Sequence, residues 1–327
     1  MSRHAVLSGP AALLAAWLVS GASVLAADAD WTGCKQGKEP DRSIAACTGI
    51  IRGGAQGTEQ DRAVAFTWRG NAHIEKKAYD RALADLNEAV RLDPKAAFAF
   101  RQRGTAFLFK AQYSRAIADF SAAIRLDSGD GGAFFQRGTA YELLNKHDMA
   151  IADFSQTIRL APTFATAYEN RGAAFAHKRQ LDRAITDFNE AIRLDPKSAG
   201  AFLNRGHAYI EKGQDDRAIA DLDEAIRLIP TLAEAFFHRG RARMGRARGG
   251  SSTYNRPELD RALADFDQAV RLSPTAEHLF SRGAAHAIKG DCRRALPDFE
   301  AALAIEPNHA AALPSRQACQ QALSKGR

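Results

Sequence analysis

Several kinds of sequence signal are missing from this chain of 327 residues. It has no zinc-protease helix motif, no phosphate-binding loop, no serine-elbow motif and no closely paired cysteines of the metal-knuckle type. It holds only four cysteines in total. Since each of those motifs supplies residues that a particular reaction or metal needs, we expect no enzyme activity, no cofactor and no metal site.

An apolar run long enough to cross a membrane is also missing. The apolar stretch at residues 11–19 stops short of the roughly 20 residues that a bilayer span requires. A short basic start, this stretch and the small residues after it are typical of a secretory signal peptide. We expect residues 1–27 to be removed, by cleavage at Ala26-Ala27 or Ala27-Asp28. The mature protein would then be periplasmic or secreted without a membrane span, and an uncleaved anchor is the alternative.

Positive charge is spread along the chain and does not form one basic stripe. The net charge is +7, and arginines recur at regular intervals. This distribution disfavours a nucleic-acid partner. One local excess, five arginines within residues 239–248, precedes a lengthened turn near residues 249–257. It is either a site for an acidic partner beside a loop, or a solvated basic helix with a tolerated insertion.

The dominant positive signal is an Arg-Gly pair that recurs every 34 residues. Its arginines are Arg69, Arg103, Arg137, Arg171, Arg205 and Arg239, followed after a longer interval by Arg282. Around each pair, apolar residues follow helical spacing in two segments, with turn residues between them and, in most units, a proline after the second. This period predicts seven helix pairs over residues 63–309.

These repeats resemble the tetratricopeptide-repeat (TPR) family. The glycine position is filled in every repeat, and the family's small position holds Ala82, Ala116, Ala150, Ala184, Ala218, Ala262 and Ala295. The chain departs from the family at several positions: an arginine stands where leucine usually precedes the glycine, Ser128 stands where proline is expected, and Arg243 and His286 stand where aromatic residues are usual. The resemblance implies an all-α fold, a right-handed α-solenoid of about seven TPR helix-turn-helix repeats. We expect a capping helical hairpin and linker at residues 28–62, and a capping helix and tail at residues 310–327.

Each arginine of the pair has an aspartate at a fixed distance. Asp85, Asp119, Asp153, Asp187, Asp221 and Asp298 stand sixteen residues after their arginines, and Asp265 is the counterpart in the longer sixth repeat. An antiparallel helix pair with its turn midway brings the two side chains to one height. The spacing predicts a ladder of exposed Arg–Asp pairs, each contributing about 0–1 kcal/mol.

The four cysteines allow three connectivities. The ends of a seven-repeat stack lie too far apart for the Cα separation of about 4.4–6.8 Å that a disulfide tolerates. We therefore predict local pairs, Cys34 with Cys47 and Cys292 with Cys319, each stapling one end of the array.

Because the sequence has no catalytic motif, we expect the protein to function through a binding surface. The resemblance implies a non-catalytic scaffold or adaptor of the cell envelope, whose first helices line a concave groove for a peptide or protein. The candidate partner-binding residues are Phe98, Arg101, Phe135, Leu203, His207, Phe237, Arg241 and Phe280. They suit a partner with apolar anchors and acidic character. Two alternatives stay open: these side chains merely seal gaps between first helices, or the protein is a structural assembly factor that couples envelope complexes through its outer faces.

Overall fold

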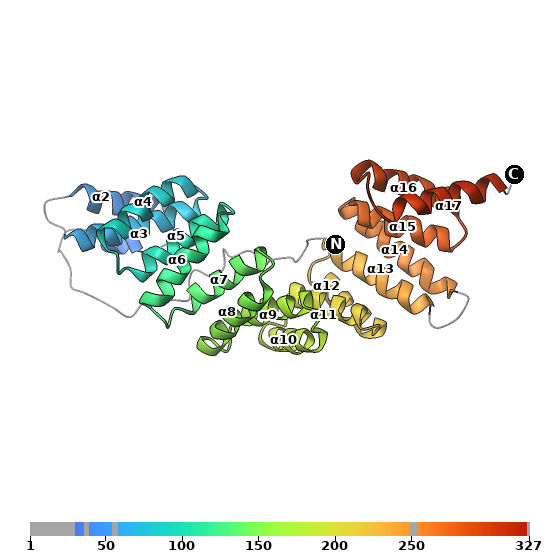
Figure 1. Cartoon of the computed structure of the whole chain (residues 1–327), viewed down its shortest axis with the longest axis horizontal. Helices are drawn as coiled ribbons and strands as arrows, with labels where there is room; N and C mark the ends of the chain where they lie inside the picture. Colours follow the sequence, from blue (N-terminus) through green and yellow to red (C-terminus); the bar gives the residue numbers. More distant parts are fainter. Residues whose placement is uncertain (1–29, 36–38, 54–57, 249–253, 326–327) are drawn as a thin grey trace. The chain divides into compact units, whose positions relative to one another are not determined.

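The computed structural model describes residues 30–35, 39–53, 58–248 and 254–325 (Figure 1). Within these ranges the chain forms seventeen α-helices and no strand, which confirms the all-α prediction. None of the described helices is long and apolar enough to span a membrane. The predicted signal peptide, residues 1–27, and part of the predicted turn at residues 249–257 lie outside the described residues.

The described part of the chain divides into two compact units, and the boundary between them in the sequence falls between Lys178 and Arg179. The N-terminal unit contains α1 (Trp31–Lys35), α2 (Pro40–Arg52), α3 (Glu59–Glu75), α4 (Tyr79–Leu92), α5 (Ala97–Phe109), α6 (Tyr113–Leu126), α7 (Gly131–Leu143), α8 (His147–Leu160) and α9 (Ala165–His177). The C-terminal unit contains α10 (Leu181–Leu194), α11 (Ala199–Glu211), α12 (Asp215–Leu228), α13 (Ala233–Arg248), α14 (Arg256–Leu272), α15 (Ala276–Ile288), α16 (Cys292–Ile305) and α17 (Ala312–Lys325).

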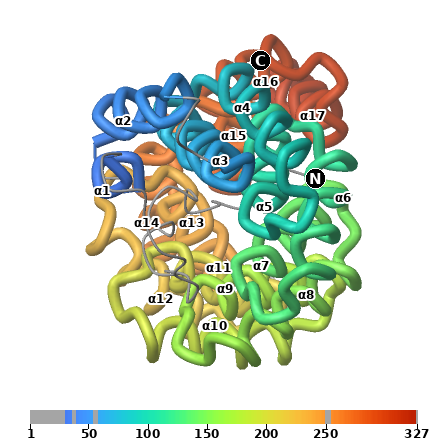
Figure 2. Tube along the Cα trace, turned by 90° about the vertical axis from the view of Figure 1, so that its left-hand side faces the viewer, coloured from blue at the N-terminus to red at the C-terminus, as the bar shows by residue number. Residues whose placement is uncertain are grey.

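Helices α3 to α8 in the N-terminal unit and α11 to α16 in the C-terminal unit stack as helix pairs. The first helix of a pair packs against its own second helix, as α5 does against α6, and against the first helix of the next pair, as α5 does against α7. The same pattern holds in the C-terminal unit, where α11 contacts both α12 and α13. Figure 2 shows successive pairs following one another through each unit. This is the repeat arrangement that the 34-residue period predicts.

Small residues and one large apolar side chain form the core of each repeat. In the third repeat, a Cβ atom added to Gly138 of α7 would lie 2.8 Å from Cε1 of Phe154 in α8, which no real side chain tolerates. Ala150, one turn before Phe154, is fully buried. The glycine is therefore needed because the two helices approach most closely there, and Phe154 fills the space that it leaves.

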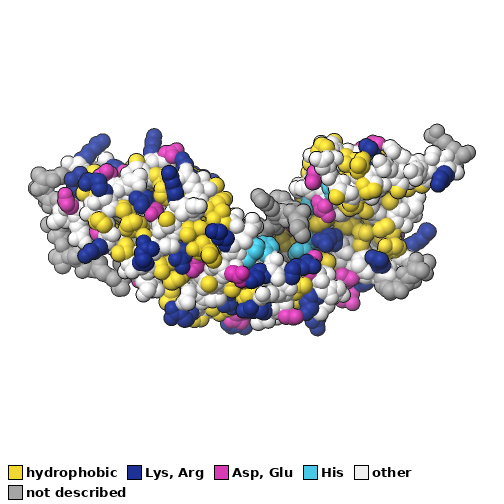
Figure 3. Space-filling model, in the orientation of Figure 1, with side chains coloured by type: hydrophobic (Ala, Val, Ile, Leu, Met, Phe, Trp, Pro, Cys, Tyr) yellow, Lys and Arg dark blue, Asp and Glu magenta, His cyan; other side chains and the backbone are white. Residues whose placement is uncertain are grey.

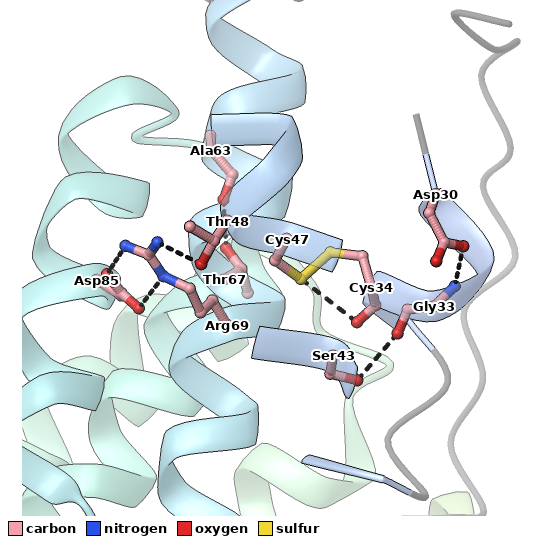
Figure 4. Close-up of a disulfide and its surroundings, with 10 residues drawn as sticks. All are labelled: Asp30, Gly33, Cys34, Ser43, Cys47, Thr48, Ala63, Thr67, Arg69 and Asp85. Atoms are coloured by element: carbon pink, nitrogen blue, oxygen red, sulfur yellow. Dashed lines mark hydrogen bonds and ion pairs between the residues drawn. A yellow bond between two sulfur atoms is a disulfide. The ribbon is translucent and has the colours of Figure 1, made fainter. Parts of the chain in front are cut away.

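The array begins with two short elements joined by a cysteine pair (Figure 4). The Cα atoms of Cys34 in α1 and Cys47 in α2 are 4.8 Å apart, and the two sulfur atoms are bonded. The Ser43 hydroxyl donates to the Gly33 carbonyl oxygen at 3.1 Å, which ties α2 to α1 a second time. At the other end, Cys292 of α16 is bonded to Cys319 of α17, with Cα atoms 5.1 Å apart. The structure has the local connectivity that the sequence predicts.

The first helix of the first repeat extends beyond the predicted start of that repeat at residue 63. Helix α3 begins at Glu59, not at residue 63. Thr58 accepts a hydrogen bond from the backbone N–H of Asp61, and the Asp61 carboxylate accepts one from the backbone N–H of Thr58. This reciprocal capping satisfies free N–H groups of the first turn and fixes the helix start there.

The Arg–Asp ladder is present, and its rungs are buried more than predicted. In the third repeat, Arg137 donates from Nε and Nη2 to the two carboxylate oxygens of Asp153, both at 2.8 Å. The Asp153 side chain is only 6% exposed, so the prediction of an exposed pair is wrong. The carboxylate is covered because the rung lies between the two packed helices. Breaking one such pair leaves a buried charge without its partner, which costs more than losing a surface pair.

Each ladder arginine also has a third hydrogen bond, which the sequence analysis did not predict. Arg137 donates from Nη1 to the Ser121 hydroxyl of α6, in the preceding repeat, at 2.9 Å. The arginines of the other repeats bond in the same way to Thr48, Asn87, Ser155, Asn189, Asp223 and Asp267. Arg137, which stands where the family usually has leucine, thus joins three helices at once.

Candidate binding surface

The first helices carry the residues predicted to bind a partner. They are α3, α5, α7 and α9 in the N-terminal unit and α11, α13 and α15 in the C-terminal unit. The eight predicted residues all lie on these helices, but they differ in how much of each reaches the solvent.

In the N-terminal unit, two predicted aromatic residues are partly exposed. Phe98 packs against Trp68 of the preceding repeat, with ring centroids 5.1 Å apart. Phe135 packs against Phe164 at 5.0 Å. Both keep part of their surface accessible. Each ring is therefore held in place by a neighbouring aromatic side chain while one part remains available for contact.

Arg101 has a different role from the one predicted. It is 8% exposed, and its Nε lies 2.8 Å from Oδ2 of Asp130. Its guanidinium also lies 5.0 Å from the centre of the Phe98 ring. Asp130 is the N-cap of α7. Arg101 therefore fixes the start of the next first helix, and little of it is left for a ligand.

Amide side chains on the same first helices link neighbouring repeats, and they were not predicted from the sequence. Gln102 donates from Nε2 to Oδ1 of Asn71 at 2.6 Å, which joins α5 to α3. The hydroxyl of Thr105 lies 3.1 Å from Oε1 of Gln136, which joins α5 to α7. The signal was an amide residue directly before the Arg-Gly pair, as in Gln102, Gln136, Asn170 and Asn204. Gln136 remains partly exposed, so it can also offer hydrogen bonds to a ligand.

In the C-terminal unit, the predicted residues divide into buried and exposed ones. Leu203 and Phe237 are 3% and 5% exposed, so these two seal gaps between helices. His207, Arg241 and Phe280 are partly exposed. The Arg241 guanidinium lies 5.8 Å from the centre of the Phe237 ring. The accessible surface of α11, α13 and α15 is therefore more polar than predicted.

Histidines lie in a row across these three first helices, and histidine side chains (cyan) reach the surface on the face drawn in Figure 3. The His207 and His238 ring centroids are 4.6 Å apart. Burial lowers the pKa of His238 well below 6.5, and the nearby charges of His207, Arg241 and His278 act in the same direction. Burial also lowers the pKa of His278, but hydrogen bonds to Glu234 and to a backbone carbonyl outweigh it and raise the pKa.

Three of the five arginines of the basic helix α13 are paired with carboxylates of α14. Arg239 donates from Nη2 to Asp265 at 2.6 Å, and Arg243 Nη1 lies 2.9 Å from the same carboxylate. Arg246 donates from Nη2 to Glu258 at 2.6 Å. These three arginines hold α14 against α13, so they do not form a free basic patch.

A cluster of one carboxylate and two imidazoles lies at the end of the N-terminal unit. Glu142 is in the last turn of α7, His147 is the first residue of α8, and His177 is the last residue of α9. Burial would raise the pKa of Glu142, but hydrogen bonds from the two histidines hold it below its usual value. The hydrogen bond to Glu142 raises the pKa of His177. The sequence analysis, which expected no metal site, did not find this group.

The stacked helix pairs define an α-helical repeat protein, and the family models identify which one. A model described as tetratricopeptide repeat matches residues 37–97, 101–165 and 254–310, and a second, described as TPR repeat, matches residues 175–213 and 206–245. Together they cover more than half of the chain. The chain belongs to the tetratricopeptide-repeat family. No curated protein has a sequence that matches it.

Solved structures show the same fold. The crystal structure of YrrB, described as a TPR protein with an unusual peptide-binding site, is 28% identical over 59% of this chain and 96% of that chain, with a TM-score of 0.51. A tetratricopeptide-repeat protein from Parabacteroides merdae is 18% identical over 79% of this chain and 98% of that one, with a TM-score of 0.60. The APC/C hetero-tetramer Cut9–Hcn1 is 18% identical, with a TM-score of 0.63; the match covers 88% of this chain and 54% of that chain.

Proposed function

We propose that this protein is a non-catalytic scaffold that binds an extended peptide or protein segment on its first-helix surface. The observation that carries the proposal is that the first helices of the N-terminal unit keep two aromatic side chains, Phe98 and Phe135, and one amide side chain, Gln136, partly exposed. Rings can bury apolar side chains of a partner, and amides can bond to its backbone. The similarity to YrrB, which is described as having a peptide-binding site, supports the proposal.

We further propose that the protein acts in the cell envelope after export. The predicted signal peptide at residues 1–27 supports this location, as do the two bonded cysteine pairs. Disulfides persist in oxidising compartments and are rare in reducing ones. Determination of the N-terminal residue of the exported protein tests the proposal: a chain that starts at Ala27 or Asp28 is expected, and an intact N-terminus points to an anchor.

An acidic character of the partner is a separate part of the proposal. His207 and Arg241 place positive or ionisable groups on the accessible surface of the C-terminal unit. Neutralising Arg241 should change the salt dependence and the association rate more than the dissociation rate. Equal losses at low and high salt for Arg241→Gln would exclude this charge contribution.

Residue-specific crosslinking tests the binding surface. A photoreactive amino acid at Phe135 samples the first-helix surface, and one at Met149, whose side chain is 51% exposed on α8, samples a second helix of the same repeat. We expect a partner to be crosslinked from position 135 and not from position 149. With that partner in hand, Phe135→Ala should weaken binding about 30-fold, which corresponds to the roughly 2 kcal/mol of one aromatic anchor.

Met149→Ala is the matched control, because it removes an exposed side chain of similar size without touching the first helices. Circular dichroism and thermal melting of both variants separate lost binding from lost folding. Unchanged affinity of a folded Phe135→Ala variant would remove the basis of the proposal.

The runner-up function is a structural assembly factor that couples complexes through the outer faces. A specific observation favours it: several large apolar side chains are exposed on or directly after second helices, namely Leu126, Met149, Ile229, Leu272 and Ile305. Crosslinking from position 149 and not from position 135 would favour this function.

A further inference from the structure

We propose that Glu142, His147 and His177 form a binding site for a divalent transition-metal ion such as Zn²⁺. The three side chains come from α7, α8 and α9 and converge at one junction between the third and fourth repeats. One oxygen and two imidazole nitrogens, one ligand atom from each residue, lie within 4.8 Å of one another. Imidazole nitrogens and carboxylate oxygens are the ligands by which Zn²⁺ and related ions are held in proteins.

The distances between these atoms come close to those of a metal centre. Nδ1 of His147 lies 3.0 Å from both Glu142 oxygens, and Nδ1 of His177 lies 2.5 Å from one of them. Ligand atoms at about 2.0–2.2 Å from a tetrahedral ion stand roughly 3.4 Å apart. His177 would therefore retreat from the carboxylate by about 1 Å, and side-chain rotation alone can supply such a movement. The Glu142 and His147 side chains need only small adjustments.

The three side chains of the proposed site are all partly exposed, so an ion can reach them from solvent. The side chain of Glu142 is 12% exposed, that of His147 is 22% exposed and that of His177 is 47% exposed. The Glu142 carboxylate is therefore the most buried of the three ligands, and rotation of the more exposed His177 imidazole can give an ion access to it. Three protein ligands leave at least one coordination position open, which water or a side chain of a bound partner can occupy.

The corresponding positions two repeats earlier show that this cluster is not needed for the fold. Tyr79 and Phe109, which precede His147 and His177 by 68 residues each, stack on one another with ring centroids 5.3 Å apart. Ile74, the counterpart of Glu142, is a buried apolar residue. The same junction is therefore stable with purely apolar contacts. At the third and fourth repeats, all three positions hold metal-ligating residue types instead.

The two histidine rings lie as close together as the aromatic rings that they replace, although they are tilted by 49° where Tyr79 and Phe109 are stacked at 17°. Their ring centroids are 5.0 Å apart, compared with 5.3 Å for Tyr79 and Phe109. The backbone of the repeat therefore brings the two imidazoles together without any special loop. Binding an ion there would link the end of α9 to the turn between α7 and α8, and would stabilise the junction between two repeats.

Calorimetric titration of the purified, tag-free full chain with ZnCl₂ tests the proposal. We expect one saturable equivalent, and a rise in the thermal melting temperature when Zn²⁺ is present. His177→Ala, His147→Ala and Glu142→Gln should each weaken binding tenfold or more. Bound Co²⁺ should give the visible absorption of a low-coordinate N/O site in the wild-type chain, and this absorption should be lost in His177→Ala.

His207→Ala is the matched control. His207 is 43% exposed and lies 3.8 Å from Glu211, so it is a histidine of similar exposure beside a carboxylate and outside the proposed site. It should leave Zn²⁺ affinity and the Co²⁺ spectrum unchanged. Glu142→Gln keeps the size and hydrogen-bonding capacity of the side chain, so a fold that survives this change separates metal binding from folding. Absence of saturable binding, equal affinity in His177→Ala, or an equal loss in His207→Ala would each overturn the proposal.

Discussion

The arginine ladder gives the most direct test of how the repeats are held together. Arg137→Leu restores the residue that the family usually has before the glycine. The change removes the two hydrogen bonds to Asp153 at 2.8 Å and the bond to Ser121 at 2.9 Å. The hydrogen bonds to Asp153 also raise the pKa of Arg137, because they favour its charged form. The Asp153 carboxylate then stays between α7 and α8 without its cation.

The expected loss of stability depends on how far the two side chains of the pair are buried. Removing one partner of a fully buried pair costs about 3–5 kcal/mol. Asp153 is 6% exposed but Arg137 is 19% exposed, so water reaches one side of this pair and the cost is reduced. We expect Arg137→Leu to lower the free energy of unfolding by about 2–4 kcal/mol. The double variant Arg137→Leu with Asp153→Leu removes both charges, and should lie within about 1 kcal/mol of the wild type.

Hydrogen exchange across α7 and α8, together with thermal melting, measures the effect. Exchange reports on local opening, which matters because a repeat array need not unfold in one step. Lys110→Gln is the control, since its ion pair with Asp80 is exposed, with side chains 30% and 86% accessible. That change should alter stability by no more than about 0.5 kcal/mol. If Arg137→Leu costs as little as the control, or the double variant costs as much as two single losses, the buried-pair reasoning is wrong.

Three further predictions concern the ends and the C-terminal unit. Replacing Cys34 and Cys47 by serine should destabilise the N-terminal unit by about 3 kcal/mol, measured by urea unfolding without reductant, and reductant should abolish the difference from the wild type. Because the pKa of His238 is lowered well below 6.5, the unfolded chain binds more protons there, and this residue should make the C-terminal unit less stable as the pH falls below about 6.5. Melting curves of His238→Gln should show a weaker loss than the wild type between pH 6.5 and 5. Phe237→Ala should cost about 3–5 kcal/mol of stability, whereas Phe280→Ala, at a partly exposed ring, should cost less in the same melt.

The repeat architecture could be predicted from the sequence because its signals recur. The Arg-Gly pair and the alanine at the small position stand at the same place in each unit, so seven copies agree on one geometry. The Arg–Asp pairing followed from the sixteen-residue spacing alone. The burial of these pairs could not be predicted, because the exposure of a side chain depends on how the helices pack and not on residue spacing.

The binding surface could be predicted only in part. Phe135 and Phe237 stand at equivalent positions of their repeats, yet the first is partly exposed and the second is 5% exposed. Each ring lies against a second ring, Phe164 at 5.0 Å from Phe135 and His278 at 4.8 Å from Phe237, and these neighbours stand at different positions of the repeat. The exposure of each ring therefore depends on neighbouring side chains that the repeat pattern does not specify.

The cluster of Glu142, His147 and His177 could not be found from the period, because it uses three different positions of the repeat and occurs at one junction. A search for residues that depart from the repeat would have found it. Residues that depart from the repeat can give one array a binding site that other arrays of the same fold lack.

The third hydrogen bond of each ladder arginine also bears on how an array of this kind can lengthen. In the regular repeats, the arginine reaches sixteen residues forward and sixteen residues back, as Arg205 does to Asp221 and Asn189. A duplication of any 34 consecutive residues regenerates both bonds, wherever the ends of the duplicated segment fall. Other lengths are accommodated in the connections between helices: Arg239 reaches 26 residues forward to Asp265 but still sixteen back to Asp223, and Arg282 reaches fifteen back to Asp267. Whole-repeat duplication therefore extends the array without any compensating substitution.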